Sequence, residues 1–158
     1  MQVRVQRRSL PSVPLHPHQI QTYRSKVSGP LMDRIDLHIE VPAIKFNEIS
    51  SDTAGEPSAN IRERVTRART VQQERFKSDG IYANAHMKPR HIRKYCKIDE
   101  DSQSLMETAM NRLGLSARAY NRILKVSRTV ADLEGSDKIA SHHISEAIQY
   151  RSLDRKIS

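Results

Sequence analysis

The most constraining feature of this sequence is one short stretch in which apolar and polar residues alternate. Between positions 35 and 41 the apolar residues are Ile35, Leu37, Ile39 and Val41, and the polar residues between them are Asp36, His38 and Glu40. This period of two, closed by Pro42, predicts a half-buried β-strand over residues 34–41. No other stretch reads convincingly as a strand, and a lone strand is not stable. We therefore expect its sheet partners to come from elsewhere.

The rest of the patterned sequence predicts helices, so the expected fold class is mainly α. A polar loop at residues 48–60 precedes them. Helices are predicted at about 60–78 with Asn60 as N-cap, at about 89–96, from Asp99 to Gly114, from Ser116 to Gly135, and from Ser141 onward. Their short connections are typical of a compact five-helix bundle.

The chain divides into three parts. Residues 1–22 contain Pro11, Pro14 and Pro17 and few apolar side chains, which predicts a disordered lead-in. Residues 23–56 hold the lone strand and a polar linker, and residues 57–158 hold the helices.

Composition excludes several classes of protein. The 158 residues carry a net charge of +9, with 37% hydrophobic and 4% aromatic residues, so the core should be aliphatic and modest. No apolar run is long enough for a membrane helix, and none follows the basic N-terminus as a signal peptide would require. The single cysteine, Cys96, should be a packing residue, and its lack of a partner fits a reducing cytoplasm.

Nucleotide and metal motifs are missing from these residues. None of the five glycines is followed by lysine, so no phosphate-binding loop is present, and no apolar strand ends in Asp-Glu to hold Mg²⁺. The adjacent His142 and His143 should point to different faces of a helix and be unable to chelate together. We expect no metal site, and no nucleotide hydrolysis by this chain alone.

Two arginine settings are more informative. Arg34 follows a turn at the entry to the predicted strand, where its planar fork could bind phosphate or form a salt bridge with Asp33 or Asp36. Arg118 lies in the first turn of the longest helix, where a cation opposes the helix dipole unless an anion is bound. Arg122 follows one turn later as a second candidate. The alternative for Arg118 and Arg122 is that they are ordinary surface arginines.

The stretch METAMNRLGLSARAYNRILKV allows a rival interpretation. Its helix, glycine turn and second helix resemble a DNA-binding helix-turn-helix. In a standalone DNA-binding module, Lys125 and Arg128 would contact nucleic-acid phosphates. Met110 disfavours this interpretation, because alanine is usual at that position in a tight helix crossing.

Four longer motifs carry a resemblance to a known family. They are YRSKVSGPLMDRIDLHIEVP, NAHMKPRHIRKYC, GLSARAYNRILKVSRTVADLEG and EAIQYRSLDR. Together they resemble the C-terminal third of magnesium-chelatase-like AAA+ ATPases, over about residues 18–155. The resemblance implies that residues 23–56 are the end of an AAA+ core, with its last strand, and that residues 57–158 are the helical lid.

The resemblance also implies roles for particular residues. Arg34 would be the arginine finger that reaches the ATP γ-phosphate of a neighbouring subunit, and Arg118 would be the sensor-2 residue. ATP and Mg²⁺ would be cofactors only in the full-length protein, whose partners would be the rest of the core, the neighbouring subunits of a hexameric ring, and DNA undergoing recombination in a bacterial cytoplasm. The phosphate loop is missing, so the chain is either a truncated or frame-shifted reading of a longer gene or a shortened paralogue. The first is favoured, because an exposed, half-apolar strand has no reason to survive alone.

Overall fold

The protein is described by a computed structural model over residues 18, 22, 26, 31, 34–39, 41 and 55–151. These residues contain five α-helices and one 3-10 helix: α4 (Ser58–Arg75), η1 (Asn84–His86), α5 (Pro89–Tyr95), α6 (Glu100–Leu113), α7 (Ala117–Glu134) and α8 (Ser141–Gln149). The mainly α fold class is therefore confirmed for this part of the chain. The short helix η1 was not predicted from the sequence.

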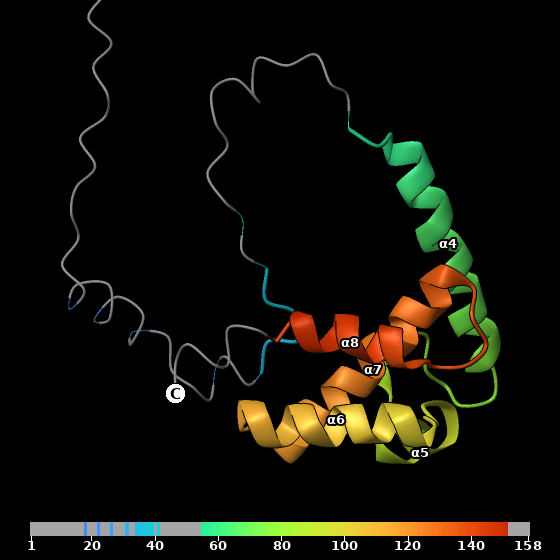
Figure 1. Cartoon of the computed structure of the whole chain (residues 1–158). Helices are drawn as coiled ribbons and strands as arrows, with labels where there is room; N and C mark the ends of the chain where they lie inside the picture. The colour runs from blue at the N-terminus through green and yellow to red at the C-terminus, as the bar shows by residue number, and fades with distance from the viewer. Residues whose placement is uncertain are drawn as a thin grey trace, which may run out of the picture.

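Helix α7 is the centre of the bundle. It packs against α8, α4, α5 and η1, while α6 packs against α8 (Figure 1). Only the C-terminal half of α4 joins the bundle, because Ala68 and Gln72 are buried there whereas Ile61 and Val65 are 42% and 46% exposed. The N-terminal half of α4 projects beyond the other helices.

The ends of the two central helices follow the sequence prediction. The Asp99 carboxylate accepts a hydrogen bond from the backbone amide three residues later at 2.9 Å, and the Ser116 hydroxyl does the same at 3.1 Å. Gly114 and Gly135 close α6 and α7 in the left-handed conformation, with φ of 61° and 81°. Helix α4 differs, since it begins at Ser58 rather than after Asn60 and ends at Arg75.

Two helices are capped from inside by a histidine at their third position. In α8 the Nδ1 atom of His143 accepts a hydrogen bond from the amide of Ala140 at 2.9 Å. In α5 the Nδ1 atom of His91 accepts one from the amide of Lys88 at 3.0 Å. Ser141 is therefore the first residue of α8 and not its cap. Both histidines are buried, with 2% or less of their surface exposed.

The core is mostly aliphatic and sulfur-containing, in line with the composition. Its buried members come from α5, α6, α7, α8 and the connections between helices: Phe76, Met87, Ile92, Cys96, Met106, Ile123, Leu124, Ile139, Ile144 and Ala147. Phe76 meets the partly buried Tyr95 edge-on, with 5.3 Å between ring centroids.

The predicted strand at residues 34–41 is wrong. None of the described positions among these residues has strand structure. A strand requires a ladder of backbone hydrogen bonds to another strand, and here the amide of His38 donates at 2.8 Å to the carbonyl of Tyr150, at the end of a helix. The burial pattern is also reversed, since His38 is 7% exposed whereas Leu37 and Ile39 are 47% and 67% exposed.

The other N-terminal predictions fall mostly outside the described residues. Of the lead-in at 1–22, only His18 and Thr22 are described, and the Thr22 hydroxyl donates to the carbonyl of His18 at 2.8 Å, as in a helical turn. Most of the polar linker, including residues 42–54, is not described either. The division of the chain at residues 22 and 56 therefore stays a prediction.

Candidate functional site

The structure brings the Arg34 segment, defined as residues 34–38, against α7 and the end of α8. The guanidinium of Arg122, in the second turn of α7, donates through Nη1 to the carbonyl oxygen of Arg34 and to the carboxylate of Asp36. The Arg122 side chain is 23% exposed and that of Asp36 is 52% exposed. Asp36 is thus the counter-ion of Arg122, whereas the sequence had offered it as a partner for Arg34.

A second arginine holds the same segment and was missed by the sequence reasoning. Arg151 follows α8 and is 1% exposed, and its Nη1 atom donates to the carbonyl of Ile35 at 2.6 Å. Beside it, the carbonyl of Tyr150 accepts from the amide of His38. The sequence does contain a signal for Arg151, because this residue lies in EAIQYRSLDR, one of the four motifs that resemble the family.

The two candidate phosphate-binding arginines both lie on the surface. Arg34 is exposed, although its backbone is held by Arg122. Arg118 is exposed in the first turn of α7, where no acidic side chain is present. Arg118 and Arg122 are four residues apart and therefore lie on one face of the helix. Helix α7 thus carries Arg118 and, one turn later, the residue that binds the Arg34 segment.

The candidate DNA-binding residues have partners inside the protein. Lys125 donates from Nζ to the carbonyl of Ala85 at 2.9 Å. Arg128 is 3% exposed, and it donates to Asp132 at 3.0 Å and to the carbonyls of Asp137 and Ser136 at 2.8 and 2.5 Å. This geometry gives Arg128 a role within the bundle and does not favour the helix-turn-helix interpretation.

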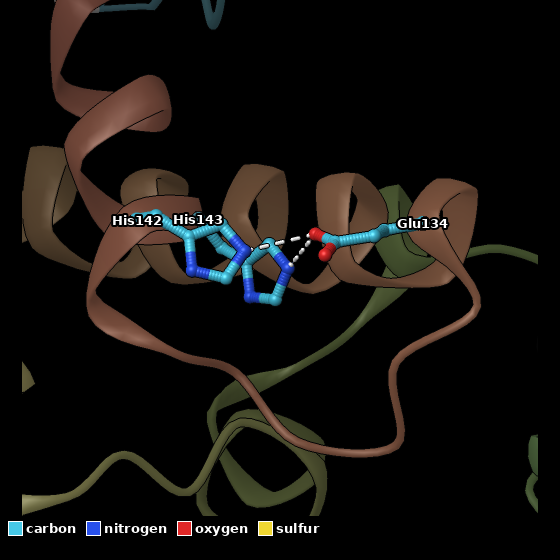
Figure 2. A group of neighbouring side chains, drawn as sticks. All are labelled: Glu134, His142 and His143. Carbon is cyan, nitrogen blue, oxygen red and sulfur yellow. Dashed lines mark hydrogen bonds and ion pairs between the residues drawn. The ribbon is translucent and has the colours of Figure 1, made fainter.

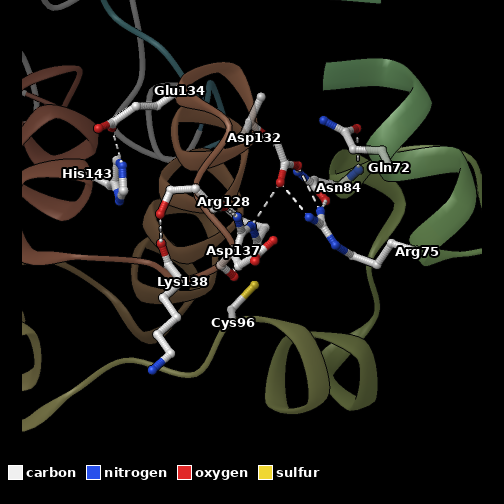
Figure 3. Close-up of polar contacts among 12 residues, drawn as sticks. Gln72, Arg75, Asn84, Cys96, Arg128, Asp132, Glu134, Asp137, Lys138 and His143 are labelled. Atoms are coloured by element: carbon white, nitrogen blue, oxygen red, sulfur yellow. Dashed lines mark hydrogen bonds and ion pairs between the residues drawn. The ribbon is translucent and has the colours of Figure 1, made fainter. Parts of the chain in front are cut away.

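Arg128 belongs to a buried polar network centred on Asp132 (Figure 3). Each carboxylate oxygen of Asp132 accepts two hydrogen bonds, from Arg75 at 2.5 and 2.7 Å, from Arg128 at 3.0 Å and from the Asn84 amide at 2.8 Å. The backbone amide of Asn84 in turn donates a hydrogen bond to the Gln72 side-chain oxygen at 3.1 Å. The network ties α4 and η1 to α7, and it is structural because the carboxylate is fully buried.

The histidine pair departs from its prediction. His142 and His143 both approach Glu134 at the end of α7, with Nε2 atoms 2.9 and 2.5 Å from the same carboxylate oxygen (Figure 2). Their rings lie 3.9 Å apart, so adjacent histidines do converge here, and His143 is fully buried rather than solvated. The loop between α7 and α8 folds back, which brings Glu134 onto the start of α8.

The proton on His143 decides what this cluster can bind. Its Nδ1 atom accepts the amide hydrogen of Ala140, so Nε2 carries the ring proton and donates to Glu134. A metal ion would need the lone pair of that same Nε2, although the three side chains are close enough to share one. The cluster therefore reads as a hydrogen-bonded junction between two helices. These bonds, first from His142 and then from His143, lower the pKa of Glu134.

Cys96 is confirmed as a buried packing residue. The residue is 5% exposed, and burial raises the pKa of its thiol to about 11. A thiol with such a pKa is protonated at neutral pH and is a poor nucleophile. Among the helices that the structure describes, none is both long and apolar enough to cross a membrane.

Comparisons with known proteins agree on one family. The family model described as magnesium chelatase, subunit ChlI C-terminal, matches residues 55–151, and the model described as magnesium chelatase, subunit ChlI, matches residues 6–49. The competence protein ComM of Haemophilus influenzae is 43% identical over 140 residues, which is 88% of this chain and 27% of that protein.

Further relatives give the same picture at lower identity. The uncharacterized protein YifB of Escherichia coli is 39% identical over 140 residues, covering 88% of this chain and 27% of that protein. The uncharacterized protein Mb2921c of Mycobacterium bovis is 30% identical over 129 residues, covering 82% of this chain and 25% of that protein. The chain thus spans about a quarter of the length of these relatives.

Proposed function

Because this chain belongs to the magnesium chelatase ChlI C-terminal family, we propose that it supplies the helical lid and the arginine finger of a ComM-type AAA+ ATPase. Arg34 stabilises charge on the phosphoryl group transferred at a neighbouring subunit's nucleotide. Arg118 binds the ATP γ-phosphate at the N-terminus of α7, where the helix dipole also favours an anion. The lid couples ATP hydrolysis to remodelling of DNA.

One observation carries this proposal: the Arg34 segment lies on the same helix that presents Arg118. Arg122 binds the backbone of that segment one turn after Arg118. Residues 34 and 118 are far apart in the sequence, yet both of their proposed roles are contacts with the ATP γ-phosphate. Their exposed side chains fit contacts with a ligand or a neighbouring subunit.

The exposed apolar residues of the N-terminal segment support a missing partner. Leu37, Ile39 and Val41 are 47%, 67% and 83% exposed, although their pattern is that of a buried strand face. A groove of about 310 Å³ runs between Leu37 and Ile39 and the side of α7. We propose that the rest of an AAA+ core, in this protein or in the neighbouring subunits of a hexameric ring, covers this face.

The same partner supplies what this chain lacks. A phosphate-binding loop, with its ATP and Mg²⁺, would come from that core, so this chain alone performs no catalysis. We propose DNA recombination as the process and a bacterial cytoplasm as the compartment, which fits a relative that is a competence protein of a bacterium. The buried, unpaired thiol of Cys96 fits that reducing environment.

A chimera tests the finger. This chain replaces the matching 140 residues of the Haemophilus influenzae competence protein ComM, and ATP turnover is compared with and without Arg34→Ala. We expect kcat to fall by about a thousandfold or more, as when other arginine fingers are removed, with ATP binding retained. Arg69→Ala, at an exposed position of α4, is the control. Turnover within a few-fold of the parent chimera in Arg34→Ala would refute the assignment.

A further inference from the structure

The Arg34 segment is held by its backbone rather than by its side chains. Arg122 binds the carbonyl of Arg34, Arg151 binds the carbonyl of Ile35 at 2.6 Å, and the carbonyl of Tyr150 binds the amide of His38 at 2.8 Å. Three main-chain contacts over five residues fix the path of the chain. The Arg34 side chain itself is left exposed.

Burial makes these contacts structural rather than incidental. Arg151 is 1% exposed, and a guanidinium is removed from water at low cost only when its donors are hydrogen-bonded. Arg122 is partly buried and pairs with the Asp36 carboxylate in addition to the backbone. Charged donors form stronger hydrogen bonds than neutral ones, so the two arginines are the main fixings of the segment.

The two arginines lie on, or directly after, helices that pack into the core. Arg122 precedes the buried Ile123 of α7, and Arg151 follows α8, whose Ile144 and Ala147 are in the core. Helices α7 and α8 pack directly on one another. Movement of α7 is therefore transmitted to the Arg34 segment, and Arg118 on the same helix moves with it.

We propose that Arg122 and Arg151 are positioning residues that clamp the Arg34 segment to α7 and α8, so that the finger and the lid move as one body. This inference rests on the proposed function of Arg34. It gives Arg122 a different role from the nucleotide contact that the sequence suggested. Phosphate bound at Arg118 then sets the place of Arg34 through the backbone clamp.

Hydrogen exchange in the chain itself tests the clamp without any nucleotide. The amide of His38 should be protected in the parent chain, because it is bonded to Tyr150. Arg122→Ala should lower that protection by about tenfold or more, the effect of losing a hydrogen bond to a charged donor. Asp36→Asn, at an exposed carboxylate, should lower it by a smaller factor without affecting the core.

One further amide and one control variant make the result decisive. Protection at Ile123 reports that the bundle remains folded in each variant, and Arg69→Ala, on the surface of α4, should leave His38 unchanged. An unprotected His38 amide in the parent chain would overturn the clamp. Unchanged protection in both Arg122→Ala and Asp36→Asn would overturn it equally.

Turnover in the ComM chimera separates positioning from nucleotide binding. Arg122→Ala should lower kcat with little change in KM for ATP, and the double variant with Arg34→Ala should be no slower than Arg34→Ala alone. A raised KM with an unchanged kcat would overturn the positioning role in favour of a nucleotide contact. If Arg34→Ala leaves turnover normal, the proposed function fails, while hydrogen exchange still decides whether the clamp exists.

Discussion

Asp132 illustrates how much a single residue can determine inside a bundle of this size. Its carboxylate is fully buried and accepts four hydrogen bonds, three of them from the guanidinium groups of Arg75 and Arg128. The buried Arg128 and the partly buried Arg75 therefore share one counter-ion. Loss of that charge leaves both guanidinium groups uncompensated, which is far more costly than the loss of a surface ion pair.

Asp132→Asn should accordingly destabilise the chain by about 3 kcal/mol or more, the cost of breaking a buried ion pair. The amide that replaces one carboxylate oxygen is a donor, and it would face donors of Arg75, Arg128 or Asn84. Urea unfolding followed by circular dichroism measures the effect. Asp137→Asn, at an exposed carboxylate in the following loop, is the control and should shift the midpoint very little.

The sequence concealed this network for a physical reason. Arg128 follows three other basic residues on α7, so charge patterning placed it on a solvated or DNA-binding face. Its pairing with Asp132, four residues on, was visible in principle, because these positions are neighbours on a helix. What the sequence could not show is that Arg75 and Asn84, from other elements, approach the same carboxylate.

At the scale of elements, local chemistry predicted the helices well and long-range contacts poorly. Helices α6 and α7 begin at the N-caps Asp99 and Ser116 and end at Gly114 and Gly135. These caps depend on contacts within a few residues, and all four are confirmed. The strand failed because its side-chain pattern describes a sheet whose other strands are not among the described residues. What holds the segment instead is a set of contacts more than 80 residues away in the sequence.

The junction of α7 and α8 gives a prediction at the same scale. The hydrogen bonds of His142 and His143 lower the pKa of Glu134 from 4.5, so Glu134 contributes stability above its unfolded pKa and loses it as the pH falls through its folded value. Glu134→Gln should therefore have a lower Tm than the parent at pH 7, and the difference should shrink below about pH 4.5.

Thermal melts over this pH range check the prediction. Glu107→Gln is the matched control, because Glu107 is exposed and lies on α6, a helix whose sequence contains no histidine. Its Tm should follow the parent at every pH. A constant difference in Tm between Glu134→Gln and the parent, from neutral to acid pH, would show that the junction is not stabilised by the ionised carboxylate.

At the scale of the whole molecule, the described residues place their apolar side chains in two different ways. The helices bury their apolar faces around α7, whereas the N-terminal segment turns Leu37, Ile39 and Val41 outward. Buried apolar helix faces are typical of a folded domain. Exposed, contiguous apolar side chains such as those of the N-terminal segment are typical of an interaction surface. The core and the exposed segment should respond differently to substitution. Core side chains stabilise the isolated chain, whereas the exposed side chains of the N-terminal segment contribute little to its stability.

Leu37→Thr combined with Ile39→Thr makes that difference measurable. Both side chains are about half exposed or more, so the Tm of the isolated chain should change little, in line with substitutions at surface positions. In the ComM chimera the same pair should lose apolar burial against the core and lower ATP turnover together with chimera stability. Tyr82→Ser, at a side chain that is 68% exposed on the bundle, should change neither property. A large fall in the Tm of the isolated chain would mean that these residues pack within it, and normal stability and turnover in the chimera would mean that no core covers them.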